Sequence, residues 1–303
     1  MHIEKKISLQ NKNTYRIGGM AAFYIAPENE EQIIESALWA SQRKIPIFIL
    51  GNGSNLLISD NGWPGLVINV SETFCDISWD HEKATAQSGA MLNMLISQSI
   101  DRALSGLEEL SGIPGTIGGA VIMNAGAFSM CVENAVEWVR YFDIATGKII
   151  TCSKSAMQFD YRTSLLKNKH VIILTTGFAF NHSKSCDELV SIRSSILSRR
   201  KEKQPLEYPN CGSVFKRPMN NFAGTLIEKC GLKGMRIGGV EVSVKHANFI
   251  INRDNGTAED VRSLITLVQK TVYEREKILL EPEVIFMGFF KNELFIPQTD
   301  AKG

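Results

Sequence analysis

The sequence of 303 residues has no C-x-x-C pair, and its six cysteines stand apart at Cys75, Cys131, Cys152, Cys186, Cys211 and Cys230. Closely spaced cysteines are the usual sign of a zinc site, and disulfide frameworks are typical of short secreted chains. The five histidines show no ligand spacing either. We therefore expect no bound metal and no disulfide framework, and the cysteine usage favours a reducing cytoplasm.

Long apolar runs and an excess of one charge are also missing. The longest apolar segments, 45–51 and 171–180, are far shorter than the roughly 20 residues that span a bilayer. The first ten residues, MHIEKKISLQ, contain no apolar core of a secretory signal. With 33 basic and 32 acidic residues, the formal net charge is +1. Proteins that bind nucleic acids or membrane surfaces usually carry an excess of basic residues, and this chain has none to speak of. We therefore expect a cytoplasmic globular protein that binds neither.

Four segments have a helical pattern. Apolar side chains recur at helical spacing in three of them, residues 29–44, 91–104 and 257–277. Asn29 is suited to cap the first helix, and Thr257 and Asp260 have the spacing of a capping box. The fourth segment, the polar stretch 186–203 ending in SRRKEKQP, has the character of a helical connector. We expect a domain boundary at 183–203.

Short β-branched segments predict strands. They are residues 45–50, 65–70, 83–88, 119–123, 135–144, 171–180, 239–243, 247–252 and 283–289. Strands and helices interleave without strict alternation, so the pattern favours an α+β fold over a doubly wound parallel sheet.

Two glycine-rich loops are the strongest local signals, GNGSNLLISD (51–60) and SGIPGTIGGAVIMNAGA (111–127). Glycine lets backbone N–H groups approach an anion without a Cβ in the way. The first loop is not a Rossmann fingerprint, because Leu56 stands where the third glycine belongs, and it lacks a Walker A ending. A single Gly-x-Gly is most often a tight turn. Two such loops, with neutral donors such as Asn52 and Asn124, favour a dinucleotide or nucleotide site of non-Rossmann type.

Eight motifs in order resemble the UDP-N-acetylenolpyruvoylglucosamine reductases, bacterial flavoenzymes of peptidoglycan synthesis, and the resemblance spans residues 13–288. The motifs are NTYRIGG (13–19), GNGSNLL (51–57), SGIPGTIGGAVIMNAGA (111–127), YRTS (161–164), NCGSVFKRP (210–218), AGTLIEKCGLKGMRIGG (223–239), KHANFIIN (245–252) and LEPEV (280–284). The glycine loops alone would indicate only the wider class of p-cresol-methylhydroxylase-type FAD domains.

The resemblance implies an FAD-binding domain at 1–190, with subdomains at about 1–70 and 71–190, and an α+β substrate-binding domain at 191–303. It also implies non-covalent FAD, NADPH as the reductant, and UDP-N-acetylglucosamine enolpyruvate as the substrate. The short interval after Arg162 indicates the shorter family type, which lacks a tyrosine-bearing substrate loop. The implied FAD-binding positions are Gly51, Asn52, Gly53, Ser54, Asn55, Ser111, Gly112, Ile113, Pro114, Gly115, Gly118, Gly119, Asn124 and Gly126.

The same resemblance implies a catalytic set of Arg162, Ser213 and Glu283. Hydride transfer from flavin N5 to C3 of the enolpyruvyl group pushes negative charge onto C2 and its carboxylate, where a guanidinium and a protonated carboxyl stabilise it. Ser213 is implied to give the proton to C2. Taken singly, Arg162 fits a surface ion pair, Ser213 a turn hydroxyl and Glu283 a solvated charge. The pattern does not distinguish Glu283 from Glu281.

Lys203, Arg217 and His246 match positions implied to bind the substrate, although many relatives have asparagine where Arg217 stands. Cys211 matches a small apolar position, so we expect its thiol to pack rather than react. Two alternatives stay open at this point. The chain could be an oxidase of the same FAD-domain type, or a nucleotide-binding protein without catalysis.

Overall fold

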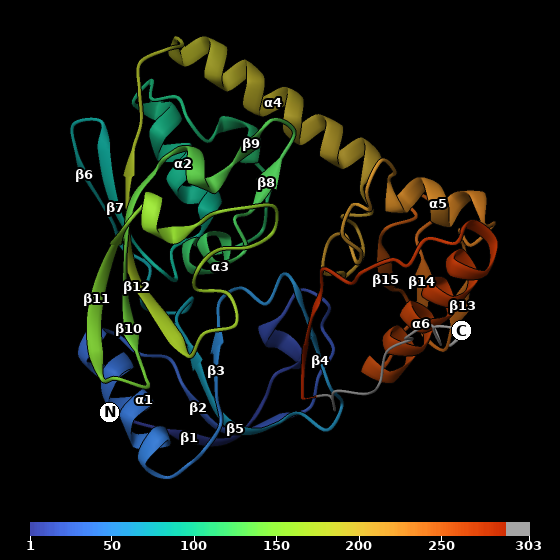
Figure 1. Cartoon of the computed structure of the whole chain (residues 1–303), viewed down its shortest axis with the longest axis horizontal. Coiled ribbons are helices and arrows are strands. Elements are labelled where there is room, and N and C mark those ends of the chain that lie inside the picture. Colours follow the sequence, from blue (N-terminus) through green and yellow to red (C-terminus); the bar gives the residue numbers. More distant parts are fainter. Residues whose placement is uncertain (289–303) are drawn as a thin grey trace, which may run out of the picture. The chain divides into compact units, whose positions relative to one another are not determined.

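The computed structural model describes residues 1–288 and divides into two compact units (Figure 1). Each unit is built from three stretches of chain. Unit 1 contains Met1–Ile7, Ala21–Gly53 and Pro64–Glu202, and unit 2 contains Ser8–Met20, Ser54–Trp63 and the chain from Lys203 on. The resemblance implied a boundary at 190/191, but one uninterrupted helix runs through that point. The units change at 202/203, within the stretch 183–203 where the sequence pattern placed the boundary. The two short N-terminal stretches of unit 2 had no signal in the sequence.

Unit 1 begins with a four-stranded sheet in the order β1-β2-β5-β3. Its strands are β1 (Glu4–Ser8), β2 (Met20–Ile25), β3 (Ile47–Leu50) and β5 (Trp63–Asn69). Helix α1 (Glu30–Gln42) contributes Ile33, Ala37 and Ala40 to the core beside this sheet. The predicted cap is confirmed, since the side chain of Asn29 accepts a hydrogen bond from the Gln32 N–H at 3.0 Å.

A five-stranded antiparallel sheet forms the rest of unit 1, in the order β11-β10-β12-β7-β6. Its strands are β6 (Ile77–Asp80), β7 (Lys83–Gln87), β10 (Val136–Asp143), β11 (Lys148–Ser153) and β12 (Val171–Ala179). Helices α2 (Leu92–Asp101) and α3 (Ile117–Ile122) share its buried core, and a hairpin of β8 (Gly126–Ala127) and β9 (Met130–Cys131) follows α3. Two apolar clusters fill unit 1, and the smaller one also includes Phe142, Ile172 and Leu174 from the five-stranded sheet. The predicted division into subdomains at about residue 70 stays a prediction.

One strand prediction was wrong. Residues 119–123, expected as a strand, lie mostly in helix α3. Thr116 caps this helix, and Gly118 lets it pack closely, since a Cβ there would be 3.0 Å from the Ser88 Cβ. The short apolar run at this place fits a buried helix as well as a buried strand, so periodicity could not separate the two.

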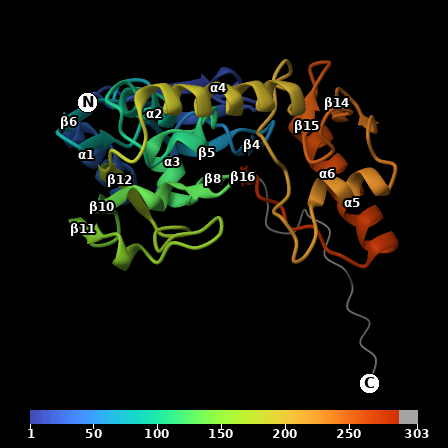
Figure 2. The same ribbon diagram turned by 90° about the horizontal axis from the view of Figure 1, so that it is seen from above.

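Helix α4 (Cys186–Lys203) is the predicted polar connector, and it is one uninterrupted helix (Figure 2). It buries only Leu189 and Ile196. At its first turn the Cys186 thiol donates to the carbonyl oxygen of Ile100 in α2, with 3.4 Å between the sulfur and the oxygen. The helix therefore packs on the rest of unit 1 through a narrow apolar stripe. Its other faces are polar, which explains why its sequence has only a weak hydrophobic pattern.

Unit 2 combines two small sheets with two helices. The antiparallel sheet holds β13 (Arg236–Ile237), β14 (Val240–Val242) and β15 (Ile250–Asn252), and β4 (Leu56–Ile58) pairs in parallel with β16 (Ile285–Met287). The helices are α5 (Ala223–Lys229) and α6 (Ala258–Glu276). The expected stripe of α6 is buried as predicted. Only the last residue of the predicted strand 283–289 lies outside the described residues.

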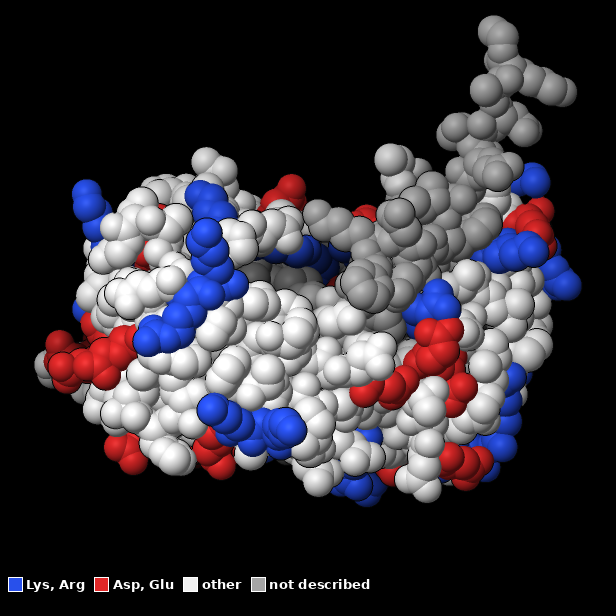
Figure 3. Space-filling view, turned by 90° about the horizontal axis from the view of Figure 1, so that it is seen from below, with Lys and Arg blue, Asp and Glu red and all other residues white. Residues whose placement is uncertain are grey.

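Charges of both signs are scattered over the face shown in Figure 3, as the small net charge leads one to expect. No helix in residues 1–288 is long and apolar enough to cross a membrane. All six cysteines are free thiols.

The first turn of α6 is capped twice, once from within and once from a distant segment. Thr257 and Asp260 form the predicted capping box. The carboxylate of Asp60 accepts hydrogen bonds from the N–H groups of Ala258 at 3.0 Å and Glu259 at 3.2 Å, across a separation of 198 residues for the first. A carboxylate at this end of a helix satisfies unpaired N–H groups and interacts favourably with the helix dipole. This contact joins the stretch 54–63 to the C-terminal part of unit 2.

We expect Asp60→Ala to lower the free energy of unfolding by about 1–2 kcal/mol, the usual cost of losing a helix N-cap. Chemical denaturation followed by circular dichroism measures the change. Glu274→Ala, which removes an exposed acid from the far end of the same helix, is the control and should change stability by less than about 0.5 kcal/mol. Equal effects of the two substitutions would contradict the capping role.

Candidate active site

The two glycine loops predicted to bind a nucleotide meet within unit 1. A Cβ added to Gly51 would be 2.4 Å from the Thr116 Oγ1, so only glycine allows this approach. Next to it, the Asn52 side-chain amide donates to the carbonyl oxygen of Pro114 at 2.6 Å. Residues 62 positions apart are thus joined directly. The sequence placed both loops in one site, and the contact confirms that they lie together.

Asn93 of helix α2 sets the shape of the second loop. Its Oδ1 accepts from the Gly112 N–H at 2.6 Å, and its Nδ2 donates to the Ile113 carbonyl at 2.8 Å. Gly112 has φ = +86°, a left-handed conformation that favours glycine. Sequence reasoning missed Asn93, because an asparagine on the half-buried side of an amphipathic helix carries no signal of its own.

A network of polar side chains also holds the first loop through the carbonyl group of Gly51. The Ser71 hydroxyl lies 3.2 Å from the Gly51 carbonyl oxygen and 2.8 Å from the Asn69 Oδ1. The Asn69 amide donates in turn to the Tyr24 hydroxyl at 2.8 Å. Burial, and the hydrogen bond from Tyr24 to Glu72, raise the pKa of this tyrosine, so the hydroxyl keeps its proton. Gly51 is therefore fixed on both sides, by Thr116 and by this network.

The loops leave backbone donors unused. The first N–H groups of α3 are occupied, since Ile117 donates to Ala90 and Gly118 to Ser88, each at 2.8 Å. By contrast, the N–H groups of Asn52, Gly115 and Thr116 have no hydrogen-bond acceptor among residues 1–288. Neutral backbone donors that have no acceptor within the protein suit phosphate oxygens. These residues therefore fit the pyrophosphate of a dinucleotide such as FAD.

The first loop continues from unit 1 into unit 2 at Ser54. Asn55 there donates from Nδ2 to the Glu283 carbonyl at 3.1 Å, and its own carbonyl accepts from the Ile285 N–H at 2.9 Å. The segment after the loop is thereby paired with the chain that carries a predicted catalytic glutamate. Cofactor binding by Ser54 and Asn55 stays a prediction.

Arg162 lies against the end of the second glycine segment in unit 1. Its Nη2 donates to the Gly126 carbonyl at 3.0 Å, and its guanidinium is 5.1 Å from the centre of the Tyr161 ring. Its φ of 55° is uncommon for a residue with a side chain, so local contacts hold the backbone in place. One such contact is from the Lys167 Nζ to the Arg162 carbonyl, at 2.8 Å.

Asn124, predicted to bind the cofactor, is 4% exposed. Its Nδ2 donates to Glu133 at 3.1 Å and to the Asp160 carbonyl at 3.2 Å, and its Oδ1 accepts from the Glu133 N–H. These contacts give it a structural role beside Arg162, and its contact with a cofactor stays a prediction.

Ser213 and Glu283 lie on neighbouring extended segments of unit 2. The Glu283 N–H donates to the carbonyl of Val214 at 2.7 Å, and Phe215 forms a bridge with Pro282. Before the serine, Gly212 has φ = +81°. The predicted proton donor and the predicted carboxyl group are therefore brought together through their backbones.

The structure distinguishes the two glutamates of LEPEV. The Glu281 side chain is 70% exposed and forms an ion pair with Lys216. Glu283 is half-buried. Since a carboxyl group keeps a proton only where burial or like charge disfavours its ionised form, Glu283 is the better candidate for that role.

The three predicted substrate-binding residues have different surroundings. Lys203, at the end of α4, is exposed. The guanidinium of Arg217 lies 4.1 Å from the centre of the Phe222 ring. His246 packs edge-on against Phe249, and burial lowers its pKa, so the imidazole stays neutral to a lower pH than that of an exposed histidine. Their binding roles stay predictions.

Cys211 is 3% exposed in the core of unit 2. Burial raises the pKa of its thiol to about 12. Its neighbour Tyr15 is fully buried and donates to the Ile250 carbonyl at 2.9 Å. A thiol that stays protonated is a poor nucleophile, which supports the packing role predicted for it.

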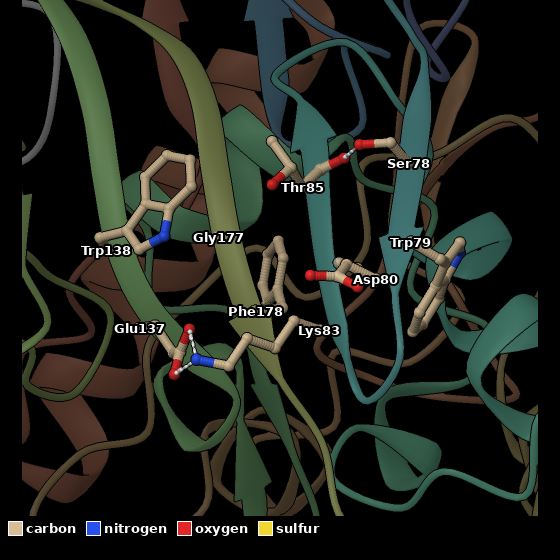
Figure 4. Close-up of a pocket in the computed structure, with 10 residues that line it drawn as sticks. Ser78, Trp79, Asp80, Lys83, Thr85, Glu137, Trp138, Gly177 and Phe178 are labelled. Carbon is tan, nitrogen blue, oxygen red and sulfur yellow. Dashed lines mark hydrogen bonds and ion pairs between the residues drawn. The ribbon is translucent and has the colours of Figure 1, made fainter.

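A hollow of about 190 Å³ on the five-stranded sheet contains none of the predicted site residues (Figure 4). Trp138 lies against Gly177, where a Cβ would be 2.2 Å from the indole. Lys83 and Glu137 form an ion pair at 2.9 Å on its rim. The hollow has no cluster of donors comparable to the glycine loops, so the candidate site is at the loops.

Two family models match successive parts of the chain. Residues 204–287 match the model of the C-terminal domain of UDP-N-acetylenolpyruvoylglucosamine reductase, and residues 21–153 match an FAD-binding domain model. The chain is 43% identical to the UDP-N-acetylenolpyruvoylglucosamine reductase of Caldicellulosiruptor bescii over 290 residues, which cover 95% of this chain and 92% of that protein. It is 40% identical to the enzyme of that name from Clostridium botulinum, over 94% of this chain and 93% of the other.

A solved structure agrees with these matches. The crystal structure of UDP-N-acetylenolpyruvylglucosamine reductase from Thermus caldophilus is 32% identical in sequence and superposes with a TM-score of 0.81. The alignment covers 95% of this chain and 99% of that one. The likeness therefore includes both units and both predicted domains.

We expect iodoacetamide at pH 8 to modify the exposed Cys186 in the folded protein and to leave Cys211 unmodified. Only a thiolate reacts with iodoacetamide. Because the pKa of Cys211 is raised to about 12, its thiol stays protonated at pH 8, and its burial also blocks access of the reagent. Peptide mass spectrometry before and after unfolding in guanidinium measures both sites. Labelling of Cys211 in the folded state at a rate similar to that of Cys186 would show that the thiol is reactive.

Proposed function

The chain belongs to the family of UDP-N-acetylenolpyruvoylglucosamine reductases, and from this we propose that it reduces UDP-N-acetylglucosamine enolpyruvate to UDP-N-acetylmuramate with NADPH. Its class is that of an FAD-dependent oxidoreductase of peptidoglycan precursor synthesis. The observation that carries the proposal is the full-length identity to reductases of this name, 43% over 95% of the chain. The cytoplasmic location expected from the sequence is part of the same proposal.

The substrate's enolpyruvyl group fixes what the site has to provide. FAD, when bound, supplies a two-electron carrier between NADPH and the substrate. The protein has to hold the substrate carboxylate while negative charge develops next to it, and it has to exclude water from that region. A guanidinium serves this purpose because it donates two parallel hydrogen bonds to a carboxylate and stays charged at any working pH. We assign this task to Arg162, whose contact with the Gly126 carbonyl links it to the glycine segment.

Ser213 and Glu283 serve the carbon that receives the proton. Ser213 gives its hydroxyl proton to C2, and the protonated carboxyl of Glu283 donates a hydrogen bond to the substrate carboxylate. A serine hydroxyl is a weak acid, so the transfer depends on its position and on a strongly basic carbon acceptor. The backbone hydrogen bond from Glu283 to Val214 at 2.7 Å supports this assignment, because it holds the two residues in a fixed relation.

The test of the proposed function is NADPH oxidation by the purified, FAD-loaded chain with and without UDP-N-acetylglucosamine enolpyruvate. We expect oxidation to depend on the substrate and to yield UDP-N-acetylmuramate in equal amount, detected by mass spectrometry. An oxygen electrode records the competing reaction. Oxygen consumption with no product formed would favour an oxidase and contradict the proposal.

We expect Ser213→Ala to leave reduction of the flavin by NADPH nearly unchanged and to slow its reoxidation by substrate about 10²–10⁴-fold, the usual contribution of a general acid. Stopped-flow absorbance separates the two half-reactions. Ser263→Ala on α6, which removes a hydroxyl bonded to Glu259, is the control and should change neither. If reoxidation by substrate kept its rate in Ser213→Ala, the assignment of the proton donor would be wrong.

A further inference from the structure

The Arg200 side chain of helix α4 lies against the second glycine loop at Gly112. A Cβ placed on Gly112 would be 2.7 Å from the Arg200 Cδ, 3.2 Å from its Nε and 3.1 Å from the Leu197 Cδ2. Leu197 and Arg200 are three residues apart and therefore lie on one face of the helix. The last turns of α4 therefore pack directly on the backbone of the loop, and the Nε end of the Arg200 guanidinium lies beside Gly112.

The loop needs a charge that its own residues do not have. None of the FAD-binding positions expected from the sequence is charged, and the unused donors of the loops are neutral N–H groups. A pyrophosphate carries two negative charges, and binding it in a partly desolvated place is costly unless a cation is near. Charge-assisted hydrogen bonds to phosphate are roughly twice as strong as neutral ones.

Arg200 has the properties of such a cation. It is half-buried, and burial lowers its pKa, although a guanidinium stays protonated. Its neighbour Arg199 is exposed and lies 5.0 Å from the centre of the Phe128 ring. The two adjacent arginines thus differ in position, since Arg200 lies against Gly112 and Arg199 lies over Phe128.

We propose that Arg200 is a cofactor-binding residue, whose guanidinium supplies the positive charge for the pyrophosphate of FAD on loop 111–116. The proposal rests on the proposed function only in taking FAD as the dinucleotide. The competing explanation is that Arg200 stabilises the C-terminal end of α4, where any cation interacts favourably with the helix dipole. The sequence could not reveal this role, because Arg200 stands in a run of basic residues that resembles a solvated helix end.

The test compares the affinities of the deflavinated full-length chain for FAD and for riboflavin, which has the same ring and no phosphate. We expect Arg200→Gln to weaken FAD binding by about 10- to 100-fold, the loss of a charge-assisted phosphate contact, and to leave riboflavin binding unchanged. Arg200→Lys, which keeps the charge without the planar fork, should lie in between. Arg199→Gln is the matched control and should bind both flavins like the parent chain. Quenching of flavin fluorescence measures each affinity, and circular dichroism checks the fold.

Three results would overturn the proposal. Equal weakening of FAD and riboflavin binding by Arg200→Gln would indicate a structural role for Arg200. Unchanged FAD binding together with a raised KM for the UDP substrate would assign the charge to the substrate's diphosphate instead. Equal effects of Arg199→Gln and Arg200→Gln would favour the helix-end explanation. Because flavin binding is measured without turnover, absence of reductase activity would contradict the proposed function and leave this test intact.

Discussion

The close approach of the two glycine loops is the constraint on which the candidate cofactor site depends. Gly51 and Thr116 leave no room for a Cβ between them. Thr116 also caps α3, and Ser71 contacts the other side of Gly51. The same few atoms therefore join strand β3, which ends at the first loop, to helix α3, which lies within the second glycine segment. A side chain at position 51 would displace both loops at once, so the geometry of the donors depends on a contact that involves no charge and little apolar area.

Much of the fold followed from local pattern. The three amphipathic helices, the Asn29 cap and the Thr257–Asp260 box were predictable because each depends on residues within one turn. The error at 119–123 arose where a short apolar run fits two structures and only packing on Ser88 decides between them. Strands such as β1 and β6 were missed because they are short and partly exposed.

The candidate site was predictable to the extent that glycines and ordered motifs mark it. The expectation that the two loops lie together is confirmed, because only glycine at position 51 leaves room for the Thr116 side chain. Asn93 and Arg200 were missed, since each acts on the loop from a helix whose own pattern looks ordinary. The choice between Glu281 and Glu283 needed the structure, which places one in an exposed ion pair with Lys216 and the other half-buried.

The cap that Asp60 provides for α6 has a consequence for folding during synthesis on the ribosome. The residues that complete the helix start emerge from the ribosome 198 positions after the carboxylate that caps them. Strand β4 is separated from its partner β16 by still more of the chain, since Leu56 pairs with Ile285. Stretches 8–20 and 54–63 therefore remain without their native contacts to the chain from Lys203 on during most of synthesis, which leaves apolar residues such as Leu57 without those partners. A C-terminal fragment produced alone would also lack these stretches, so unit 2 is not a separable domain, although most of its residues are contiguous.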